Sequence, residues 1–170
     1  MTLASPEYVR LLQQHHAESG WGAGGARYAR RLAPFLRGRV LDYGCGKGAL
    51  VRALLSMGVD AEGYDPAVQQ YAALPVGQFD FVVSTDVLEH VEPDHLHTVL
   101  AHIRALSDCA FLTVSTVPAK AVLPDGRNAH LTVADAEWWS RLLGVLYTSV
   151  ERMPELEFTP FAPTFHCLSH

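Results

Sequence analysis

The clearest chemistry in the sequence lies in a glycine-rich turn. The turn, 44–48 (GCGKG), directly follows 40–43 (VLDY), which has the composition of a short strand. Glycines let a backbone approach a ligand closely, and a helix after such a turn offers free N–H groups. Gly44, Gly46 and Ala49 also fit the G-x-G-x-x-G/A pattern of dinucleotide sites. The turn therefore predicts a ligand site at the end of the first strand.

Two carboxylates beside this turn narrow the kind of ligand. Asp42 stands just before the turn, where a carboxylate is unfavourable beside a pyrophosphate but suits a cation such as an amino-acid ammonium. Asp65 follows the next expected strand, 61–64, and its oxygens can accept hydrogen bonds from ribose hydroxyls there. Asp42 thus argues against a dinucleotide.

Three segments in chain order carry a family resemblance: 40–48 (VLDYGCGKG), 63–67 (GYDPA) and 79–91 (FDFVVSTDVLEHV). Over residues 38–150 the chain resembles class I S-adenosylmethionine-dependent methyltransferases, and its DVLEHV element resembles small-molecule enzymes such as the ubiquinone-biosynthesis O-methyltransferases. The resemblance implies S-adenosyl-L-methionine as cofactor and S-adenosylhomocysteine as product. The cofactor-binding residues that it implies are Asp42, Gly44, Cys45, Gly46, Asp65, Pro66, Thr85, Asp86 and Val87.

Strand and helix patterns alternate along the chain, which predicts an α/β fold. We expect a doubly wound, mostly parallel Rossmann-like sheet of about six strands, completed by an antiparallel hairpin from 145–151 and 164–168. The other expected strands are 40–43, 61–64, 79–84 and 110–115. The expected helices are 5–16, 26–36, 49–57, 68–74 and 93–106, a last helix that starts at 132 or 134 and ends at 143, and a short helical turn at 86–91.

The family pattern is incomplete in one place. Residues 66–78 leave room for one short helix, but not for a helix, the usual third strand and a second helix. The third strand is therefore expected to be missing or vestigial. The chain, 1–170, is expected to form a single methyltransferase domain, with a helical cap (1–36) preceding a Rossmann-like core (37–170).

Two acids and a histidine after the third expected strand have three interpretations. Asp86, Glu89 and His90 lie at i, i+3 and i+4, so a helix would place them on one face. They could hold a divalent metal. Alternatively, Asp86 and Glu89 could form a capping box, or His90 could face the substrate. The capping box is favoured, so no metal is predicted.

The loop 118–131 is expected to shape the acceptor site, because it opens at the carboxyl end of the sheet, where ligands of such folds bind. His130 in this loop could take a proton from a substrate hydroxyl, and His90 is a second candidate base. Alternatively, the loop residues bond within their own turn, and the aromatic candidates pack the cap onto the sheet. The candidate substrate-binding residues are Trp21, Tyr28, Asn128 and His130.

Composition limits the location and the partners. The 170 residues carry a net charge of −5, although basic residues outnumber acidic ones in residues 1–52. An acidic chain is a poor nucleic-acid binder, and no run reaches the ~18 apolar residues of a membrane span. Three widely spaced cysteines indicate neither a disulfide framework nor a zinc pattern, and the first residues do not resemble a signal peptide. A cytoplasmic protein with a small-molecule substrate is expected.

The function predicted from these observations is methyl transfer from S-adenosylmethionine to a small molecule. Oxygen is favoured over nitrogen or carbon as the acceptor, since His130 or His90 could serve as a base. One alternative is an NAD(P)-dependent oxidoreductase, which shares the glycine pattern but is opposed by Asp42. The other alternative is a non-catalytic partner subunit that binds S-adenosylmethionine, and the expected loss of the third strand is consistent with it.

Overall fold

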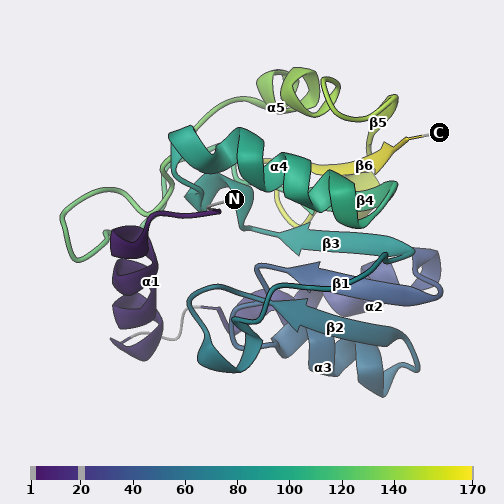
Figure 1. Cartoon of the computed structure of the whole chain (residues 1–170). Coiled ribbons are helices and arrows are strands. Elements are labelled where there is room, and N and C mark those ends of the chain that lie inside the picture. Colours follow the sequence, from purple (N-terminus) through teal and green to yellow (C-terminus); the bar gives the residue numbers. More distant parts are fainter. Residues whose placement is uncertain (1–2, 19–21, 170) are drawn as a thin grey trace.

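A mixed sheet forms the centre of the protein (Figure 1). The computed structural model describes residues 3–18 and 22–169, and these form a six-stranded sheet in the order β2-β1-β3-β4-β6-β5. The strands are β1 (Arg39–Tyr43), β2 (Asp60–Tyr64), β3 (Phe81–Thr85), β4 (Cys109–Thr113), β5 (Ser149–Arg152) and β6 (Thr164–Leu168).

The strands β1 to β4 run parallel, whereas β6 pairs antiparallel with both β4 and β5. In β1, which lies between β2 and β3, Val40 is paired with Ala61 on one side and with Phe81 on the other. Strands buried on both faces read as continuous apolar runs, as β3 and β4 do. The predicted parallel sheet and the predicted C-terminal hairpin are both confirmed.

Helices cover both faces of the sheet, and each face has its own apolar core. On one face, α4 (Pro93–Leu106) presents residues at helical spacing, including Leu96, Leu100 and Ile103, and α5 (Ala136–Leu143) buries Trp139. On the other face, α3 (Ala49–Ser56) buries Leu50, Val51 and Leu54 beside α2 (Ala29–Leu32). The fold is therefore doubly wound, as predicted.

The sheet ends at β2, which has a single neighbour. Across the described residues 65–80, which join β2 to β3, no strand forms. The predicted loss of the third strand is confirmed. The helix predicted at 68–74 is only a short 3-10 helix, Gln69–Tyr71, because its end folds back so that the Asp65 N–H donates to the Tyr71 carbonyl (3.0 Å).

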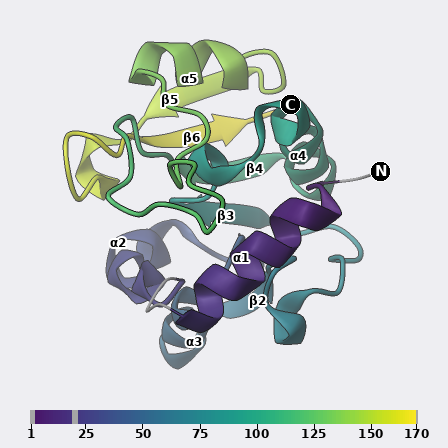
Figure 2. The same ribbon diagram turned by 90° about the vertical axis from the view of Figure 1, so that its left-hand side faces the viewer.

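The helix α1 (Pro6–Glu18) crosses the carboxyl ends of the parallel strands (Figure 2). The Tyr8 hydroxyl donates to the His90 carbonyl, and the Ser5 N–H and hydroxyl both donate to the Glu92 carboxylate (2.9 and 3.0 Å). Buried Tyr8 packs with Leu123 and Ala129 of the loop after β4. The helix is thereby fixed over the end of the sheet where ligands of such folds bind.

The helix predicted at 26–36 is divided into three short pieces. A 3-10 helix, Gly24–Tyr28, leads into α2, and a second 3-10 helix, Ala33–Phe35, follows it. Glycines at the start and Pro34 near the end explain the division, because both residue types weaken a regular α-helix.

Within the described residues, no helix is long and apolar enough to cross a membrane.

Candidate active site

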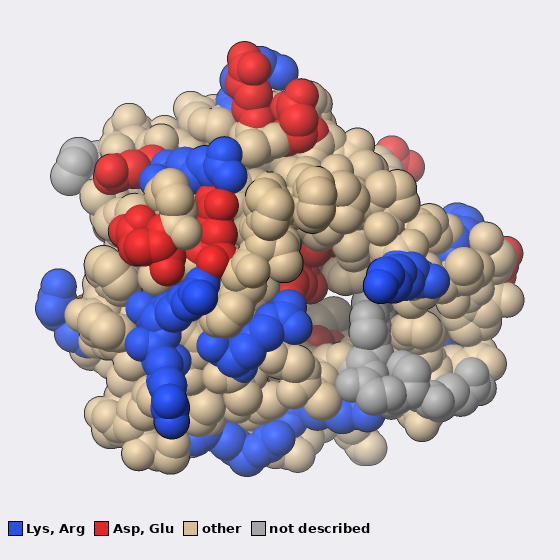
Figure 3. Space-filling view, turned by 180° about the vertical axis from the view of Figure 1, so that it is seen from behind, with Lys and Arg blue, Asp and Glu red and all other residues tan. Residues whose placement is uncertain are grey.

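A cleft lies beneath α1, at the carboxyl ends of β1, β2 and β3. It is walled by the glycine turn, the residues that follow β2 and β3, and the inner side of α1. Viewed from behind, the surface has a hollow with acidic atoms at its floor and Lys and Arg side chains around it (Figure 3). All of the cofactor-binding residues implied by the sequence line the cleft: Asp42, Gly44, Cys45, Gly46, Asp65, Pro66, Thr85, Asp86 and Val87.

The glycine turn is fastened to the end of β2. The N–H groups of Gly44 and Cys45 both donate to the Tyr64 carbonyl (2.7 and 3.0 Å). Gly46 has a φ of +53°, and a Cβ there would stand 2.6 Å from the Gly22 carbonyl oxygen. This position therefore requires glycine for its conformation and for the close approach of another backbone segment.

The carboxylate of Asp65 organises the same turn. One of its oxygens accepts the Gly46 N–H and the other accepts the Ala67 N–H (2.9 Å each). Each carboxylate oxygen has a second lone pair, so both can still accept a bond from a ligand hydroxyl. Asp65 thus joins the glycine turn to the end of β2 and keeps its oxygens at the wall of the cleft.

Asp42 is the most deeply buried acid of the cleft, with 2% of its surface exposed. Burial raises its pKa to about 8, and the negative charge of Asp65 acts in the same direction. A cation bound beside Asp42 would favour the ionised form. The Cys45 thiol nearby is also buried, which raises its pKa and makes it a poor nucleophile.

The turn after β3 carries Asp86 in a left-handed conformation, with a φ of 55°. Its carboxylate accepts a hydrogen bond from the Tyr28 hydroxyl (2.8 Å) and forms an ion pair with Arg27. The side chain therefore points to the segment before α2 and caps no helix. The long-range partners of Asp86 take the place of the capping box favoured from the sequence.

The carboxylate of Glu89 also departs from that box. Its Oε1 accepts the Ser115 N–H (2.9 Å), and the side chain is fully buried, which raises its pKa to about 8. Three groups meet at this point, because Glu89, His90 and His130 have potential ligand atoms within 4.8 Å of one another. Asp86, the third member of the metal site considered from the sequence, lies outside this group.

A family profile described as a methyltransferase domain matches residues 13–149, which is most of the chain. The chain belongs to this methyltransferase family. A ubiquinone biosynthesis O-methyltransferase from Thiobacillus denitrificans is 28% identical over 141 residues, 69% of this chain and 58% of that protein. A second, from Bordetella avium, is 36% identical over 92 residues, 39% of this chain and 38% of that protein.

The methyltransferase chain therefore spans less than two thirds of either curated relative in these matches. A solved structure of the same fold is the 1,6-didemethyltoxoflavin-N1-methyltransferase of Burkholderia thailandensis, with bound 1,6-didemethyltoxoflavin and S-adenosylhomocysteine. It matches with a TM-score of 0.69 at 20% identity and covers 99% of this chain and 92% of that one. The likeness confirms the predicted Rossmann-like methyltransferase fold.

The candidate substrate residues of the methyltransferase are dispersed. Tyr28 stands behind Asp86 and is buried. His130 does not line the cleft, whereas His90, the second candidate base, does. The Asn128 amide bonds within its own loop, to both backbone groups of Ala119 and to the His130 N–H, and does not line the cleft. Trp21 lies outside the described residues.

Several residues that line the cleft were not predicted from the sequence. Arg27, Glu92 and the α1 residues Leu12 and His16 line the cleft. The excess of basic residues in the first third of the chain was the one signal for Arg27. No spacing rule predicts where α1 packs, because its contacts connect residues more than eighty positions apart, such as Tyr8 with His90.

Proposed function

We propose that the protein transfers a methyl group from S-adenosylmethionine to an oxygen of a small-molecule acceptor. The observation that carries the proposal is the convergence of all the implied cofactor residues on one cleft at the carboxyl ends of β1, β2 and β3. Ligands of open α/β sheets bind at this edge. The methyltransferase family match opposes the oxidoreductase alternative.

In this proposal each part of the cofactor meets a group of suitable chemistry. The ammonium of the methionine part lies beside Asp42, which is buried and acidic. The ribose hydroxyls donate to the second lone pairs of Asp65, whose first lone pairs accept backbone N–H groups. Thr85, Asp86 and Val87 flank the cofactor from the end of β3. The structures of relatives with bound S-adenosylhomocysteine support this choice of cofactor.

The proposed reaction is a displacement at the methyl carbon. The acceptor oxygen gives an electron pair to that carbon, and the bond from carbon to the sulfonium breaks with its electron pair on sulfur. The products are the methyl ether and S-adenosylhomocysteine, and the proton of the acceptor hydroxyl passes to solvent. Alignment of the oxygen with the methyl group supplies much of the rate, so a cleft with α1 as one of its walls suits the reaction.

The lining of the cleft favours an acceptor with an apolar body. Leu3, Ala4 and Leu12 contribute aliphatic surface from the side of α1. His90 also lines the cleft and supplies a polar group that can orient a hydroxyl. The ubiquinone biosynthesis relatives are named as O-methyltransferases, which supports oxygen as the acceptor atom.

Calorimetric titration with S-adenosylhomocysteine tests the cofactor proposal. We expect one site on the wild-type chain, loss of binding in Asp65→Ala, and wild-type binding in Asp60→Ala, which removes an exposed carboxylate at the far end of β2. Asp65→Asn is the second variant, because it keeps one acceptor oxygen for the turn. Binding of NAD⁺ in place of S-adenosylhomocysteine, or unchanged affinity in both Asp65 variants, contradicts the proposal.

Turnover distinguishes an enzyme from a binding subunit. Incubation with S-adenosylmethionine carrying a labelled methyl group and a panel of small hydroxylated aromatic acceptors is expected to give labelled methyl ethers. Tight S-adenosylhomocysteine binding without transfer to any hydroxyl, amine or carbon acceptor would favour the non-catalytic alternative.

A further inference from the structure

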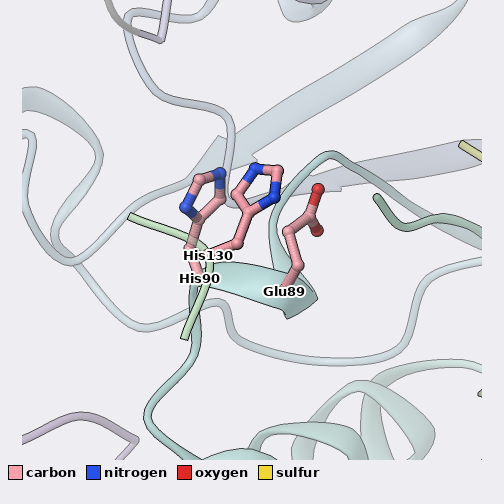
Figure 4. Close-up of side chains that lie close together, drawn as sticks. All are labelled: Glu89, His90 and His130. Atoms are coloured by element: carbon pink, nitrogen blue, oxygen red, sulfur yellow. The ribbon is translucent and has the colours of Figure 1, made fainter. Parts of the chain in front are cut away.

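We propose that Glu89, His90 and His130 form a binding site for one divalent transition-metal ion of the Zn²⁺ type, at the edge of the cleft. One carboxylate and two imidazoles supply potential ligand atoms that all lie within 4.8 Å of one another. The two rings stand with centroids 4.7 Å apart and their planes at 75°. In Figure 4 the three side chains point the same way, with the His130 ring drawn between the other two groups.

Each of the three side chains is oriented by a hydrogen bond to the backbone. The Nδ1–H of His90 donates to the Ala129 carbonyl (2.7 Å), and the Nδ1–H of His130 donates to the Val117 carbonyl (2.6 Å). A carbonyl only accepts, so in both neutral rings the lone pair is on Nε2. Such bonds from the far ring nitrogen are the arrangement that orients histidine ligands in metal sites.

The third ligand is a buried carboxylate with an unused oxygen. Glu89 is fully buried, and its Oε1 accepts the Ser115 N–H. Its Oε2 has no hydrogen-bond partner in the part of the chain that the structure describes. A buried carboxylate oxygen left without a partner is costly, and a metal ion beside the two histidines would satisfy it.

The backbone holds the two halves of the proposed site together. The Leu131 and Thr132 N–H groups both donate to the Glu89 carbonyl (2.7 and 3.0 Å), which fastens the loop of His130 to the segment of Glu89 and His90. The ligand atoms therefore need only small side-chain rotations to reach the bond lengths of ~2.0–2.2 Å that zinc requires. The site is preformed rather than assembled from mobile parts.

The ligand set selects the kind of ion. Two imidazoles suit Zn²⁺ and its transition-metal neighbours, whereas Mg²⁺ and Ca²⁺ require sites made mainly of oxygen atoms. Two histidines and one glutamate leave at least one coordination position open, as in catalytic zinc sites. His90 also lines the cleft, so the proposed ion would lie next to the space where the acceptor binds.

The role of the ion rests on the proposed function. A metal at this place would hold the acceptor oxygen and lower the pKa of its hydroxyl, so that the proton is lost to solvent before the methyl group is transferred. The two histidines would then serve as ligands and would not act as bases. Binding of the ion itself needs neither the cofactor nor the acceptor, so it can be tested separately.

Metal binding to the full chain is the decisive measurement. We would titrate the chelator-treated protein with Zn²⁺ by calorimetry and with Co²⁺ by visible absorption, which reports the geometry of the ligands. One ion per chain is expected in the wild type. His130→Ala, a change at a half-buried loop side chain, and Glu89→Gln should each weaken binding more than about 10-fold.

His166→Ala is the matched control, because the His166 ring lies 3.3 Å from the Cys109 sulfur and forms a rival pair of possible ligands. It should bind as the wild type does. Failure of the wild type to bind either ion, wild-type affinity in His130→Ala, or loss of binding in His166→Ala overturns the proposal. If Glu89→Gln does not fold, as judged by circular dichroism, His130→Ala decides alone. A parallel titration with S-adenosylhomocysteine tests the proposed function independently. If the chain binds S-adenosylhomocysteine but no metal ion, only the metal-site proposal is overturned.

Discussion

At the scale of single residues, two opposing effects act on the ionisation of Asp42: burial disfavours the charged form, and a bound cation would favour it. Burial, assisted by the charge of Asp65, raises its pKa from 3.8 to about 8. Between about pH 4 and pH 8 the folded chain therefore holds a proton that the unfolded chain releases. The contribution of Asp42 to the free energy of unfolding falls as the pH rises through this window and is constant above it.

Asp42→Asn should have opposite effects on stability and on ligand binding. The variant carries no ionisable group, so its melting temperature relative to the wild type should rise from pH 5 to pH 8.5 in the absence of ligand. Its affinity for S-adenosylhomocysteine should fall, because the proposed partner of the ammonium is lost. Thermal melts and calorimetry measure the two effects. Asp60→Asn, at the exposed start of β2, controls for loss of a carboxylate. A stability difference independent of pH would contradict the prediction.

Gly46→Ala should damage the cleft more than the same substitution at another glycine with a positive φ. A Cβ at Gly46 would meet the Gly22 backbone at 2.6 Å, in addition to the cost of a positive φ of ~1–3 kcal/mol. Gly126→Ala is the control, because Gly126 has a φ of +87° and no atom lies within 4 Å of the place that an added methyl group would occupy. Denaturant unfolding should rank Gly46→Ala as the less stable variant, and it alone should lose S-adenosylhomocysteine binding. Equal effects of the two substitutions would show that the positive φ, and not the close approach of the Gly22 backbone, determines the damage.

Residue spacing predicted part of this site and missed the rest for one physical reason. Asp42, Gly46 and Asp65 were found because the turn and the strand ends impose short-range requirements on the sequence. The partners of Asp86 and Glu89 were not found, because Tyr28 and Ser115 are 58 and 26 residues away in the chain. The local sequence pattern favoured a capping box for Asp86 and Glu89, but in the structure both carboxylates bond to residues distant in the chain.

At the scale of elements, the position of α1 depends on a few hydrogen bonds at its start. Tyr8→Phe removes the hydroxyl that donates to the His90 carbonyl and preserves the ring. We expect a loss of ~1 kcal/mol and faster hydrogen exchange in the α1 amides. Tyr147→Phe is the control, because the buried Tyr147 hydroxyl has no hydrogen-bond partner among the described residues. Faster exchange of α1 in both variants would contradict an anchoring role for Tyr8.

The helices were predicted correctly from the sequence where the apolar spacing and the helix propensity of the residues agree. The helices α3 and α4 were predicted within one residue of their ends, because apolar residues recur there at helical spacing and proline opens α4. The stretch 24–35 broke into short helices where glycine and proline interrupt the pattern. Where α1 packs could not be predicted, since a helix pattern specifies an apolar face but not the surface that covers it.

At the scale of the whole molecule, the two apolar cores lie on opposite faces of one sheet, and the cleft lies at the carboxyl edge of that sheet. The absence of the third strand was predictable from the family pattern and the length of one segment, because residues 66–78 cannot form three more elements. What length could not predict is that the cleft is closed by α1, a segment that precedes the first strand. The site therefore depends on both cores and on the N-terminal helix together.

This arrangement predicts that ligand binding stabilises the molecule as one unit. Residues from α1, β1, the end of β2 and the end of β3 all line the cleft, so S-adenosylhomocysteine binds the folded chain and not its separated parts. At a concentration 100 times its dissociation constant it should add ~2.7 kcal/mol, a rise of about 5–10 °C in melting temperature for a chain of this size. Calorimetry should show one transition that moves upward as a whole, with Asp60→Ala behaving as the wild type. A second transition that stays fixed as ligand is added would mean that one core unfolds independently of the site.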